Sequence, residues 1–362
     1  MSIPLTATTT LHPLALPPAG AAPTDLIRTY AEVRNSSILE TTGRADDALS
    51  ADELLPVLYD STASRKRHWY IAEEGTMIGC VAVDVLRDDD GRSAIAIIAI
   101  LRAHWGRGIG AAALRALETE LRAMGVHKLL CWIEHHDEGA GSIPAPTGFG
   151  SVPADRAARF LQRNGFVLEQ IERASELTWN DATSAHLDAR RAEALTHSAD
   201  YRVVQWMLPT PAELVDGYAW MKSRMSTDVP DADLDLPEEI WDAARVRELE
   251  ARQAAKGFVL QVTAAKHIAT GTLCAFNELA MRASDPSDIT HQYDTLVLEG
   301  HRGHRLGALV KTAGLLGWRE RFPRSPRVIT YNAEENRPML DINEALGFTP
   351  FAHEGAWKKD LR

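Results

Sequence analysis

The stretch from Arg302 to Gly307, Arg-Gly-His-Arg-Leu-Gly, combines residue types that can hold a phosphate. It lies between an apolar run, Thr295 to Leu298, and a helical run, Ala308 to Arg321. A strand that turns through a glycine-containing loop into a helix directs several backbone N–H groups and the positive end of the helix dipole at one point. This pattern therefore favours anion binding, to which Arg302 can add a charge-assisted contact.

The same pattern occurs once earlier in the chain. Trp105 to Gly110, Trp-Gly-Arg-Gly-Ile-Gly, follows the apolar run Ile95 to Leu101 and opens another helical run. Gly110 and Gly307 are 197 residues apart, and the Gly-Thr turns that begin at Gly75 and Gly271 are 196 residues apart. Two landmarks at nearly one spacing indicate an internal duplication.

Both loops resemble the pyrophosphate-binding motif of the GNAT acetyltransferase superfamily, Arg/Gln-x-x-Gly-x-Gly/Ala, which holds acetyl-coenzyme A in that family. The later copy keeps Arg302 and Gly307 but has Arg305 in place of the middle glycine. The earlier copy keeps both glycines of the motif but has Trp105 at the leading position. Each copy thus departs from the motif at a different place.

The resemblance implies an α+β fold of two tandem GNAT-like units, each a mostly antiparallel mixed sheet with helices on both faces. Mycothiol synthase is a two-unit member of the family with this architecture. We expect an N-terminal unit over 1–182, a linking helix over 183–199 and a C-terminal unit over 200–362.

The tight turns before the first loop also predict an antiparallel meander, because parallel neighbours need a long crossover. Thr210 to Glu213 is typical of a capping box, with proline at the first helical position of the later unit.

The resemblance also implies which residues contact acetyl-coenzyme A. The candidates in the later unit are Val297, Arg302, Gly303, His304, Arg305, Leu306, Gly307, Ala308, Asn332 and Asn336. The candidates in the earlier unit are Ile100, Trp105, Gly106, Arg107, Gly108, Ile109, Gly110 and Ala111. Asn332 and Asn336 have an equally good structural interpretation, as a strand end and as a helix cap.

Family members transfer the acetyl group directly: a base takes a proton from the substrate ammonium, the amine attacks the thioester, and a backbone N–H before the loop stabilises the oxyanion. By position, that N–H belongs to Leu298 or Val297. Asp294 is the candidate base, since the equivalent earlier strand has no ionisable side chain; a contact with a neighbouring backbone N–H is the alternative role. The family's thiolate-protonating tyrosine corresponds to Asn343 and Leu161, and neither is an acid.

Three functions remain open at this stage. The first is an N-acetyltransferase that acts on a small-molecule amine, and the second is a sensor or scaffold that binds coenzyme A without turnover. The third is a dinucleotide-dependent oxidoreductase, because Gly108-x-Gly110-x-x-Ala113 fits the Rossmann fingerprint. That fingerprint requires a glycine directly after a parallel strand, whereas residues 102–105 intervene here and an antiparallel meander is predicted.

Composition restricts the class of protein. The chain has 362 residues, 45% of them hydrophobic and 25% charged, which suits two globular domains. A formal charge of −11 argues against a general nucleic-acid binder. No apolar run reaches the roughly 18 residues of a membrane span, and the three cysteines share no Cys-x-x-Cys spacing. We expect a soluble, cytoplasmic monomer or homodimer with no nucleic-acid or membrane partner.

Residues 135–153 form an insertion relative to the later copy, rich in Gly, Pro and Ser. Its first four residues, His135-His-Asp-Glu138, include metal-ligand types, but adjacent residues on a flexible loop converge poorly on one ion. We therefore expect a solvated loop that borders the pocket of the first unit, and no metal site.

Overall fold

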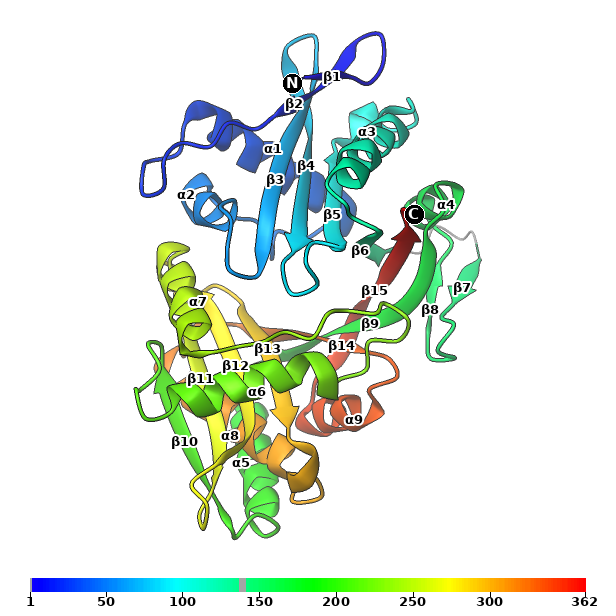
Figure 1. Ribbon diagram of the computed structural model, residues 1–362. Helices are drawn as coiled ribbons and strands as arrows, with labels where there is room; N and C mark the ends of the chain where they lie inside the picture. Colours follow the sequence, from blue (N-terminus) through cyan, green and yellow to red (C-terminus); the bar gives the residue numbers. More distant parts are fainter. Residues whose placement is uncertain (1, 137–140) are drawn as a thin grey trace. The chain divides into compact units, whose positions relative to one another are not determined.

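The computed structural model describes residues 2–136 and 141–362, which form two compact units (Figure 1). Unit 1 comprises Met1–Ile143, Pro153–Glu169 and Gly355–Arg362. Unit 2 comprises Pro144–Val152 and Gln170–Glu354. No helix in the described part of the chain combines the length and the apolarity that a membrane-spanning segment requires.

Unit 1 is a sheet with strand order β1-β2-β3-β4-β5-β6, followed by parts of β15 and β9. All pairs from β1 to β5 are antiparallel, and β5 pairs with β6 in parallel. The meander predicted before the first loop is therefore confirmed, and the Rossmann interpretation is wrong. The elements are β1 (Ile3–Pro4), β2 (Thr9–Pro13), α1 (Asp25–Thr42), α2 (Ala51–Leu54), η1 (Leu55–Val57), β3 (Ser64–Glu73), β4 (Thr76–Leu86), β5 (Ser93–Ile100), η2 (Arg102–His104), α3 (Ile109–Ala123), β6 (Lys128–His135) and α4 (Arg156–Arg163).

Helix α1 begins and ends at clear local signals. The Thr24 side chain accepts a hydrogen bond from the N–H of Ile27, and Gly43 adopts the left-handed conformation at the C-terminal end. The buried face of α1, which includes Ile27 and Tyr30, packs on Met77 of β4. Each large apolar side chain buried in this way stabilises the fold by about 1.5–3 kcal/mol.

Unit 2 repeats this plan with strand order β9-β14-β13-β12-β11-β10, and β15 lies next to β9. Only β13 and β14 pair in parallel among these strands from β9 to β10. The elements are β9 (Val167–Thr178), α5 (Asp181–Leu195), β10 (Tyr201–Met207), α6 (Val215–Asp228), α7 (Ala243–Ala255), β11 (Phe258–His267), β12 (Leu273–Arg282), β13 (Thr290–Val297), η3 (Glu299–His301), α8 (Leu306–Arg321), β14 (Arg327–Ala333), α9 (Arg337–Leu346) and β15 (Thr349–Asp360). Two short strands of the insertion, β7 (Ser142–Pro144) and β8 (Ser151–Pro153), pair with each other.

Helices cover both faces of the unit 2 sheet (Figure 1). Helices α6 and α7 pack on one face through a core that includes Tyr218, Val246 and Phe276. Helices α8 and α5 pack on the other, where Ala194 and Leu309 lie in one core cluster. The expected architecture of two tandem α+β units is confirmed.

The compact units differ from the expected ranges 1–182 and 200–362 at the last strand of each half. Residues 170–178 of β9 belong to unit 2, and residues 355–362, which include the end of β15, belong to unit 1. The expected linking helix over 183–199 is α5, which is part of unit 2 and packs on α8. These assignments depend on long-range strand pairing, which local sequence patterns do not encode.

The capping-box prediction at Thr210 is wrong. Helix α6 begins only at Val215, and its N-cap residue Leu214 makes no side-chain capping bond. The Thr210 hydroxyl instead accepts a hydrogen bond from the Trp206 indole, and its N–H donates to Glu250. These tertiary contacts outweigh the local signal.

Candidate functional site

The two glycine-containing loops have nearly the same backbone. In each, a single 3-10 turn, η2 or η3, precedes an extended residue: Trp105 has φ −70° and ψ 160°, and Arg302 has φ −68° and ψ 160°. In unit 1, the backbone then adopts a left-handed conformation, with positive φ, at Gly106 and Gly108. Gly303 and Arg305 take those positions in unit 2, where Arg305 has φ 55°. The duplicated loop conformation therefore persists although unit 2 has lost one glycine.

The strand before each loop separates from its parallel neighbour. Strand β13 pairs with β14 only at Thr290 and His291, and β5 pairs with β6 only from Ser93 to Ile95. The rest of β13 is paired on one side alone, with β12. The unpaired side presents backbone groups to the gap between the diverging strands.

The oxyanion donor expected at Leu298 is a wrong assignment, because the N–H of Leu298 donates to the carbonyl oxygen of Cys274 at 3.0 Å. Hydrogen-bonded and non-bonded pairs alternate along an antiparallel ladder. The preceding residue, Val297, therefore directs its N–H away from β12 and towards the separated side. Its carbonyl group points the same way and accepts a bond from Arg302 Nε at 3.3 Å.

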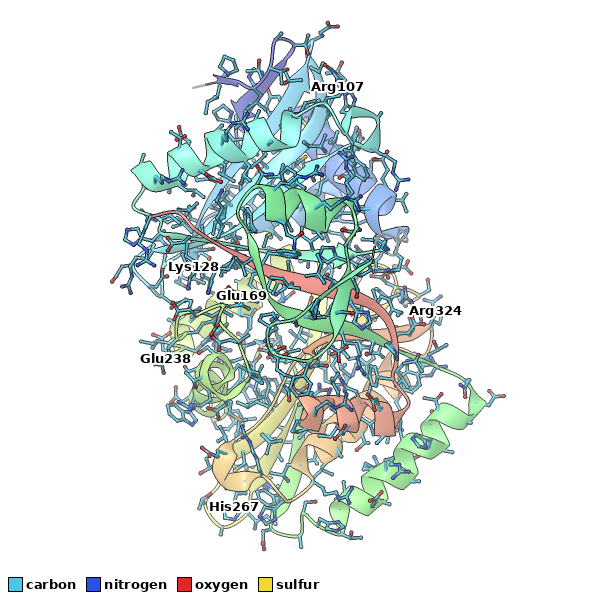
Figure 2. All side chains as sticks on the ribbon, turned by 90° about the vertical axis from the view of Figure 1, so that its right-hand side faces the viewer. Arg107, Lys128, Glu169, Glu238, His267 and Arg324 are labelled. Atoms are coloured by element: carbon cyan, nitrogen blue, oxygen red, sulfur yellow. The ribbon has the colours of Figure 1, made fainter. Side chains whose placement is uncertain are left out.

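The side chains around the unit 1 loop contact one another. Glu73 accepts hydrogen bonds from both Arg107 and Thr8, and His104 Nδ1 lies 3.0 Å from the same carboxylate (Arg107 is labelled in Figure 2). These contacts, with that of Arg107 the strongest, lower the pKa of Glu73 to about 2. The carboxylate offsets the positive charge that this loop could offer an anion.

The unit 2 loop also pairs an arginine with a carboxylate, since Arg305 Nη1 lies 3.0 Å from Glu193, but its leading arginine remains available to an anion. Arg302 is exposed and donates to two carbonyl oxygens, those of Val297 and Asp228, and it has no carboxylate partner among the described residues. The first hydrogen bond inside α8 runs from the Leu309 N–H to the Arg305 carbonyl, so the preceding N–H groups of the helix have no intrahelical acceptor. A Cβ added at Gly303 would meet no atom within 4 Å, which leaves the backbone open to a ligand.

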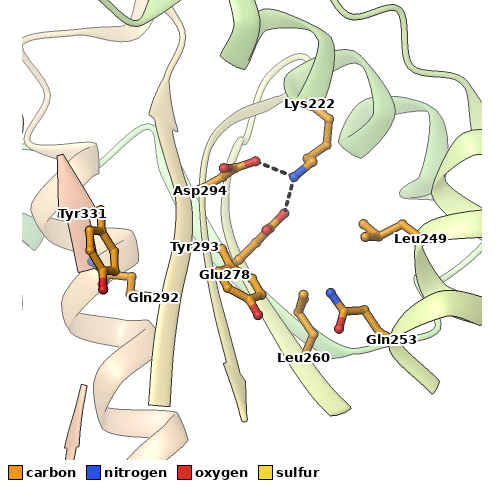
Figure 3. Close-up of a pocket in the computed structure, with 9 residues that line it drawn as sticks. All are labelled: Lys222, Leu249, Gln253, Leu260, Glu278, Gln292, Tyr293, Asp294 and Tyr331. Carbon is orange, nitrogen blue, oxygen red and sulfur yellow. Dashed lines mark hydrogen bonds and ion pairs between the residues drawn. The ribbon is translucent and has the colours of Figure 1, made fainter. Parts of the chain in front are cut away.

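A pocket of about 330 Å³ lies in unit 2 (Figure 3). It combines two carboxylates, an ammonium group, two amides and two phenols with two leucines. Its lining residues are Lys222, Leu249, Gln253, Leu260, Glu278, Gln292, Tyr293, Asp294 and Tyr331. Residues of β13 thus line this pocket, while the end of the same strand leads into the second glycine-containing loop.

An irregularity in β13 positions Asp294. The β12–β13 register shifts between Asn277 and Leu279, so that Glu278 lies opposite a bulge that contains Tyr293 and Asp294. A bulge redirects side chains relative to a regular strand. No register shift occurs between β4 and β5, the equivalent pair in unit 1.

Asp294, Lys222 and Glu278 form one ionic cluster (Figure 3). Lys222 Nζ donates to Asp294 and lies 3.2 Å from Glu278, whose carboxylate also accepts from the Tyr218 hydroxyl. The Asp294 side chain is 32% exposed and that of Glu278 only 2%. The alternative role predicted for Asp294, a contact with a neighbouring N–H, is not its role here, because its partner is the Lys222 ammonium.

Electrostatics within the cluster favour a cationic ligand. Burial raises the pKa of Glu278 and outweighs the opposing effect of Lys222. Burial lowers the pKa of Lys222, but Asp294 and Glu278 together raise it above its ordinary value. One ammonium between two carboxylates leaves an excess of one negative charge when all three groups are ionised.

The residue at the position of the family's acid, Asn343, belongs to a buried chain of hydrogen bonds. Lys311 Nζ donates to Asn343 Oδ1 at 2.8 Å, and Asn343 Nδ2 donates to Asn332 Oδ1 at 2.7 Å. The side-chain oxygen of Asn332 is thereby fixed by Asn343. Asn336 stands at the N-terminal end of α9 but makes no side-chain capping bond. In unit 1 the equivalent position is the buried Leu161.

Lys311 predicts a specific pH dependence of stability. Burial lowers its pKa from 10.5 to about 7, so between these values the unfolded chain binds a proton that the folded protein does not. The free energy of unfolding should therefore rise with pH in this window, by up to about 1.4 kcal/mol per pH unit. Urea unfolding at pH 7 and pH 9 should show this gain in the wild type, and Lys311→Met should lose it. Equal gains in both proteins would contradict the buried neutral lysine.

We expected a solvated loop over the insertion 135–153, but its first residue is not exposed to solvent. His135 is buried: its Nδ1 lies 3.0 Å from Asp155, and its Nε2 accepts a hydrogen bond from the Trp357 indole. Asp137 and Glu138 lie outside the described residues. Within the described part of the chain, no group of three or more His, Cys, Asp or Glu side chains is arranged to hold a metal ion.

Comparison with known proteins gives a family match within the first half of the chain. Residues 33–145, which include the first loop, match the model of the acetyltransferase (GNAT) family. The chain contains a GNAT domain and has a tandem GNAT fold. The fold is shared, over 98% of this chain and 99% of the other, with a tandem GNAT protein from the clavulanic acid biosynthesis pathway, at 21% identity and a TM-score of 0.73.

Two further solved structures share the GNAT fold. A GCN5-related N-acetyltransferase from Sphaerobacter thermophilus is 13% identical, with 96% of this chain and 98% of that chain covered and a TM-score of 0.58. The glucosamine N-acetyltransferase region of a fungal multi-domain β-N-acetylglucosaminidase is 12% identical, with 98% and 38% covered and a TM-score of 0.63. No curated protein matches the sequence significantly. The family match supports acyl transfer as the class of reaction.

Of the nine residues that line the unit 2 pocket, sequence reasoning singled out only Asp294; among those it missed are Lys222, Glu278 and Gln292. Glu278 is the one acidic residue of β12, where it follows Asn277 between apolar residues, and Lys222 follows the buried Met221 in α6. An isolated charge in a buried run requires a partner. That signal could have paired Lys222 with Glu278 before the structure was known, whereas nothing in the sequence distinguishes Gln292.

Proposed function

We propose that this protein is an N-acetyltransferase that moves the acetyl group of acetyl-coenzyme A to a small-molecule amine in unit 2. The observation that carries the proposal is that strand β13 contributes Asp294 to a charged pocket and ends at the loop that opens α8. Acceptor and acetyl donor would then meet along one strand. The GNAT family's use of acetyl-coenzyme A supports this choice of donor.

The pyrophosphate would lie on the N–H groups of the second loop and the N-terminus of α8, with Arg302 at its edge. The Val297 N–H would donate to the thioester carbonyl oxygen, and Asn332 would contact the pantetheine arm. The role of Val297 follows from the direction of its N–H at the separated strands, and that of Asn332 follows from its position near the end of β14. His304, Arg305, Leu306, Gly307 and Ala308 would contribute through the loop backbone.

In the transfer step, Asp294 would accept a proton from the substrate ammonium. The free amine nitrogen then forms a bond with the thioester carbon, the carbon–sulfur bond breaks, and coenzyme A leaves as the thiolate. Asp294 suits this role better than Glu278 because its side chain is more exposed. Lys222 holds both carboxylates in place. Asn343 supplies no proton, so water would protonate the thiolate.

In this proposal, unit 1 serves structure or substrate shaping. Its loop candidates, from Trp105 to Ala111, have the same backbone as the second loop, but Glu73 offsets the charge of Arg107. The Trp105 indole donates to the Ile100 carbonyl at 2.6 Å, where Arg302 contacts Val297 in unit 2. The second candidate function, a coenzyme A sensor, is favoured by the absence of an acid at Asn343 and Leu161.

Thermal melting with acetyl-coenzyme A tests the proposed donor. Specific binding at about 100 times the dissociation constant stabilises the folded state by about 2.7 kcal/mol, which raises the melting temperature. Thiol release across a panel of small amines then separates an enzyme from a sensor. Binding without thiol release would favour the sensor, and no melting shift at saturating acetyl-coenzyme A would contradict both functions.

Arg302→Ala should weaken acetyl-coenzyme A binding by about 1.5–3 kcal/mol, the range for a hydrogen bond to a charged group. Isothermal titration calorimetry measures the change. Arg191→Ala is the matched control, because Arg191 is an arginine in α5 of the same unit whose side chain is 43% exposed and pairs with Asp188, and it should leave the affinity unchanged. Equal affinities for Arg302→Ala and the wild type would show that the guanidinium does not bind the pyrophosphate.

A further inference from the structure

Three histidines surround one tyrosine beside the second glycine-containing loop. Tyr201 of β10 is 8% exposed, and its ring centroid lies 5.3, 5.7 and 5.5 Å from those of His267, His301 and His304 in turn (His267 is labelled in Figure 2). The Tyr201 hydroxyl lies 2.8 Å from His301 Nδ1, so a hydrogen bond joins these two side chains. His304 belongs to the loop 302–307 itself. This histidine cluster is therefore continuous with the loop on which we place the pyrophosphate.

The histidine cluster lacks the carboxylate that its counterpart in unit 1 contains. In the first loop, the places of His301 and His304 are taken by His104 and Arg107, and both contact the carboxylate of Glu73. In unit 2 a phenol is at the centre, and none of the three imidazoles has a carboxylate partner within the described part of the chain. The cluster can therefore accept an anion from outside the chain, which the unit 1 residues cannot do without displacing their own carboxylate.

The imidazoles of the cluster hinder one another's protonation. Burial lowers the pKa of His301, and the neighbouring His267 and His304 lower it further. The other titratable groups around the cluster are Asp200 before β10, Cys274 of β12, Glu299 of η3, Arg302, and Arg305 with its partner Glu193 of α5. An anion placed among the imidazoles favours their protonated forms and raises their pKa values. Its affinity must therefore fall as pH rises through the range in which the imidazoles lose their protons.

The anion that suits such a cluster is a phosphate monoester. Near neutral pH it carries close to two negative charges and three acceptor oxygens, because its second pKa is about 6. Coenzyme A contains one phosphate monoester, at the 3′ position of its ribose, in addition to its pyrophosphate. A ligand whose pyrophosphate lies on the second loop thus brings a phosphate monoester to the same part of unit 2.

Resting on the proposed function, we infer that His267, His301 and His304 form a binding subsite for the 3′-phosphate of acetyl-coenzyme A. His304 and His301 Nε2 donate hydrogen bonds to phosphate oxygens, and His267 adds positive charge when it is protonated. Tyr201 is a positioning residue, because its hydroxyl holds His301 through Nδ1. Binding of the donor takes up protons at this subsite.

The test compares the affinities of acetyl-coenzyme A and its 3′-dephospho form, measured by isothermal titration calorimetry at pH 6.5 and pH 8.5. The wild type should bind acetyl-coenzyme A about 10- to 100-fold more tightly at pH 6.5, the value of hydrogen bonds to a charged group. This preference should shrink about threefold or more at pH 8.5, where the imidazoles are neutral and the phosphate keeps its charge. His301→Gln/His304→Gln should bind both forms within about twofold at either pH. A wild-type preference below about twofold at pH 6.5 would overturn the inference.

Two further variants isolate the contribution of the cluster. His186→Gln removes an exposed imidazole from α5 of the same unit and should keep the wild-type preference at both pH values. A loss of preference in this variant would assign the effect to general charge and not to the cluster. His304→Lys carries a charge that does not titrate between pH 6.5 and pH 8.5, so its preference should persist at pH 8.5. A preference that disappears in His304→Lys at both pH values would contradict an electrostatic role.

The outcome for the two donor forms also separates this inference from the proposed function. If both forms bind with equal affinity, the inference fails and the proposed function stands. If inorganic phosphate then raises the melting temperature of the wild type but not of His301→Gln/His304→Gln, the cluster binds a free phosphate and not the donor. If neither form binds, the inference and the proposed function both fail.

Discussion

Asp294→Asn is expected to lower turnover by about 10²- to 10⁴-fold, the usual contribution of a positioned general base. Asparagine keeps the shape of the side chain and can still accept a hydrogen bond from Lys222, but it cannot take the ammonium proton. The affinity for acetyl-coenzyme A should stay unchanged, because Asp294 lies in the unit 2 pocket that we propose holds the acceptor. Thiol release under saturating acetyl-coenzyme A measures the loss.

The matched control for this variant is Asp216→Asn. Asp216 is exposed at the start of α6, the helix that carries Lys222, so the change removes the same charge from the same unit. It should turn over at the wild-type rate. If Asp294→Asn were also to turn over normally, Asp294 would have only a structural role beside Lys222.

Lys222→Met is expected to reduce the free energy of unfolding by about 3–5 kcal/mol, because removing one partner of a buried ionic cluster leaves its other charges uncompensated. Glu278 is the residue most affected, since its side chain is almost fully buried. The double variant Lys222→Met/Glu278→Gln should recover much of this loss, because glutamine keeps a polar partner for Tyr218 without the charge. Urea unfolding of both variants measures the difference.

The loss in Lys222→Met should also depend on pH. Burial raises the pKa of Glu278 above its ordinary 4.5, and removal of Lys222 takes away an interaction that lowers it. A carboxyl group with a raised pKa in the folded state contributes stability below the unfolded pKa and loses it as pH rises through the folded value. The deficit should thus be small near pH 4.5 and larger at pH 8. A deficit independent of pH would show that Glu278 does not carry the effect.

The loops could be predicted because their determinants are local. Glycines at fixed spacing between an apolar strand and a helix define the turn. The occurrence of this pattern twice in the chain indicates the internal duplication. The predicted start of α8 at Ala308 was only two residues late, since the helix begins at Leu306. The first loop is the clearer case, because Gly106 and Gly108 both adopt left-handed conformations that favour glycine.

The pocket could not be predicted to the same extent because its geometry depends on long-range pairing. The bulge that brings Asp294 beside Glu278 is a property of the β12–β13 register, which local patterns do not specify. The same holds for the end of β15, whose Trp357 donates to His135 in unit 1 at a separation of 222 residues. The Leu298 assignment failed for a related reason, because the alternation of the ladder decides which N–H faces the gap.

The most direct test of the central claim, that unit 2 carries out acetyl transfer, compares Gly303→Val with Gly106→Val. The two glycines are equivalent in the duplication, have φ of 85° and 77°, and would place an added Cβ where no atom lies within 4 Å. Both changes thus impose similar backbone strain, and each puts a branched side chain on one of the two glycine-containing loops. Thiol release from acetyl-coenzyme A with an accepted amine is the measurement. We predict that Gly303→Val abolishes turnover and that Gly106→Val retains most of it; the opposite result would place the chemistry in unit 1 and contradict this account.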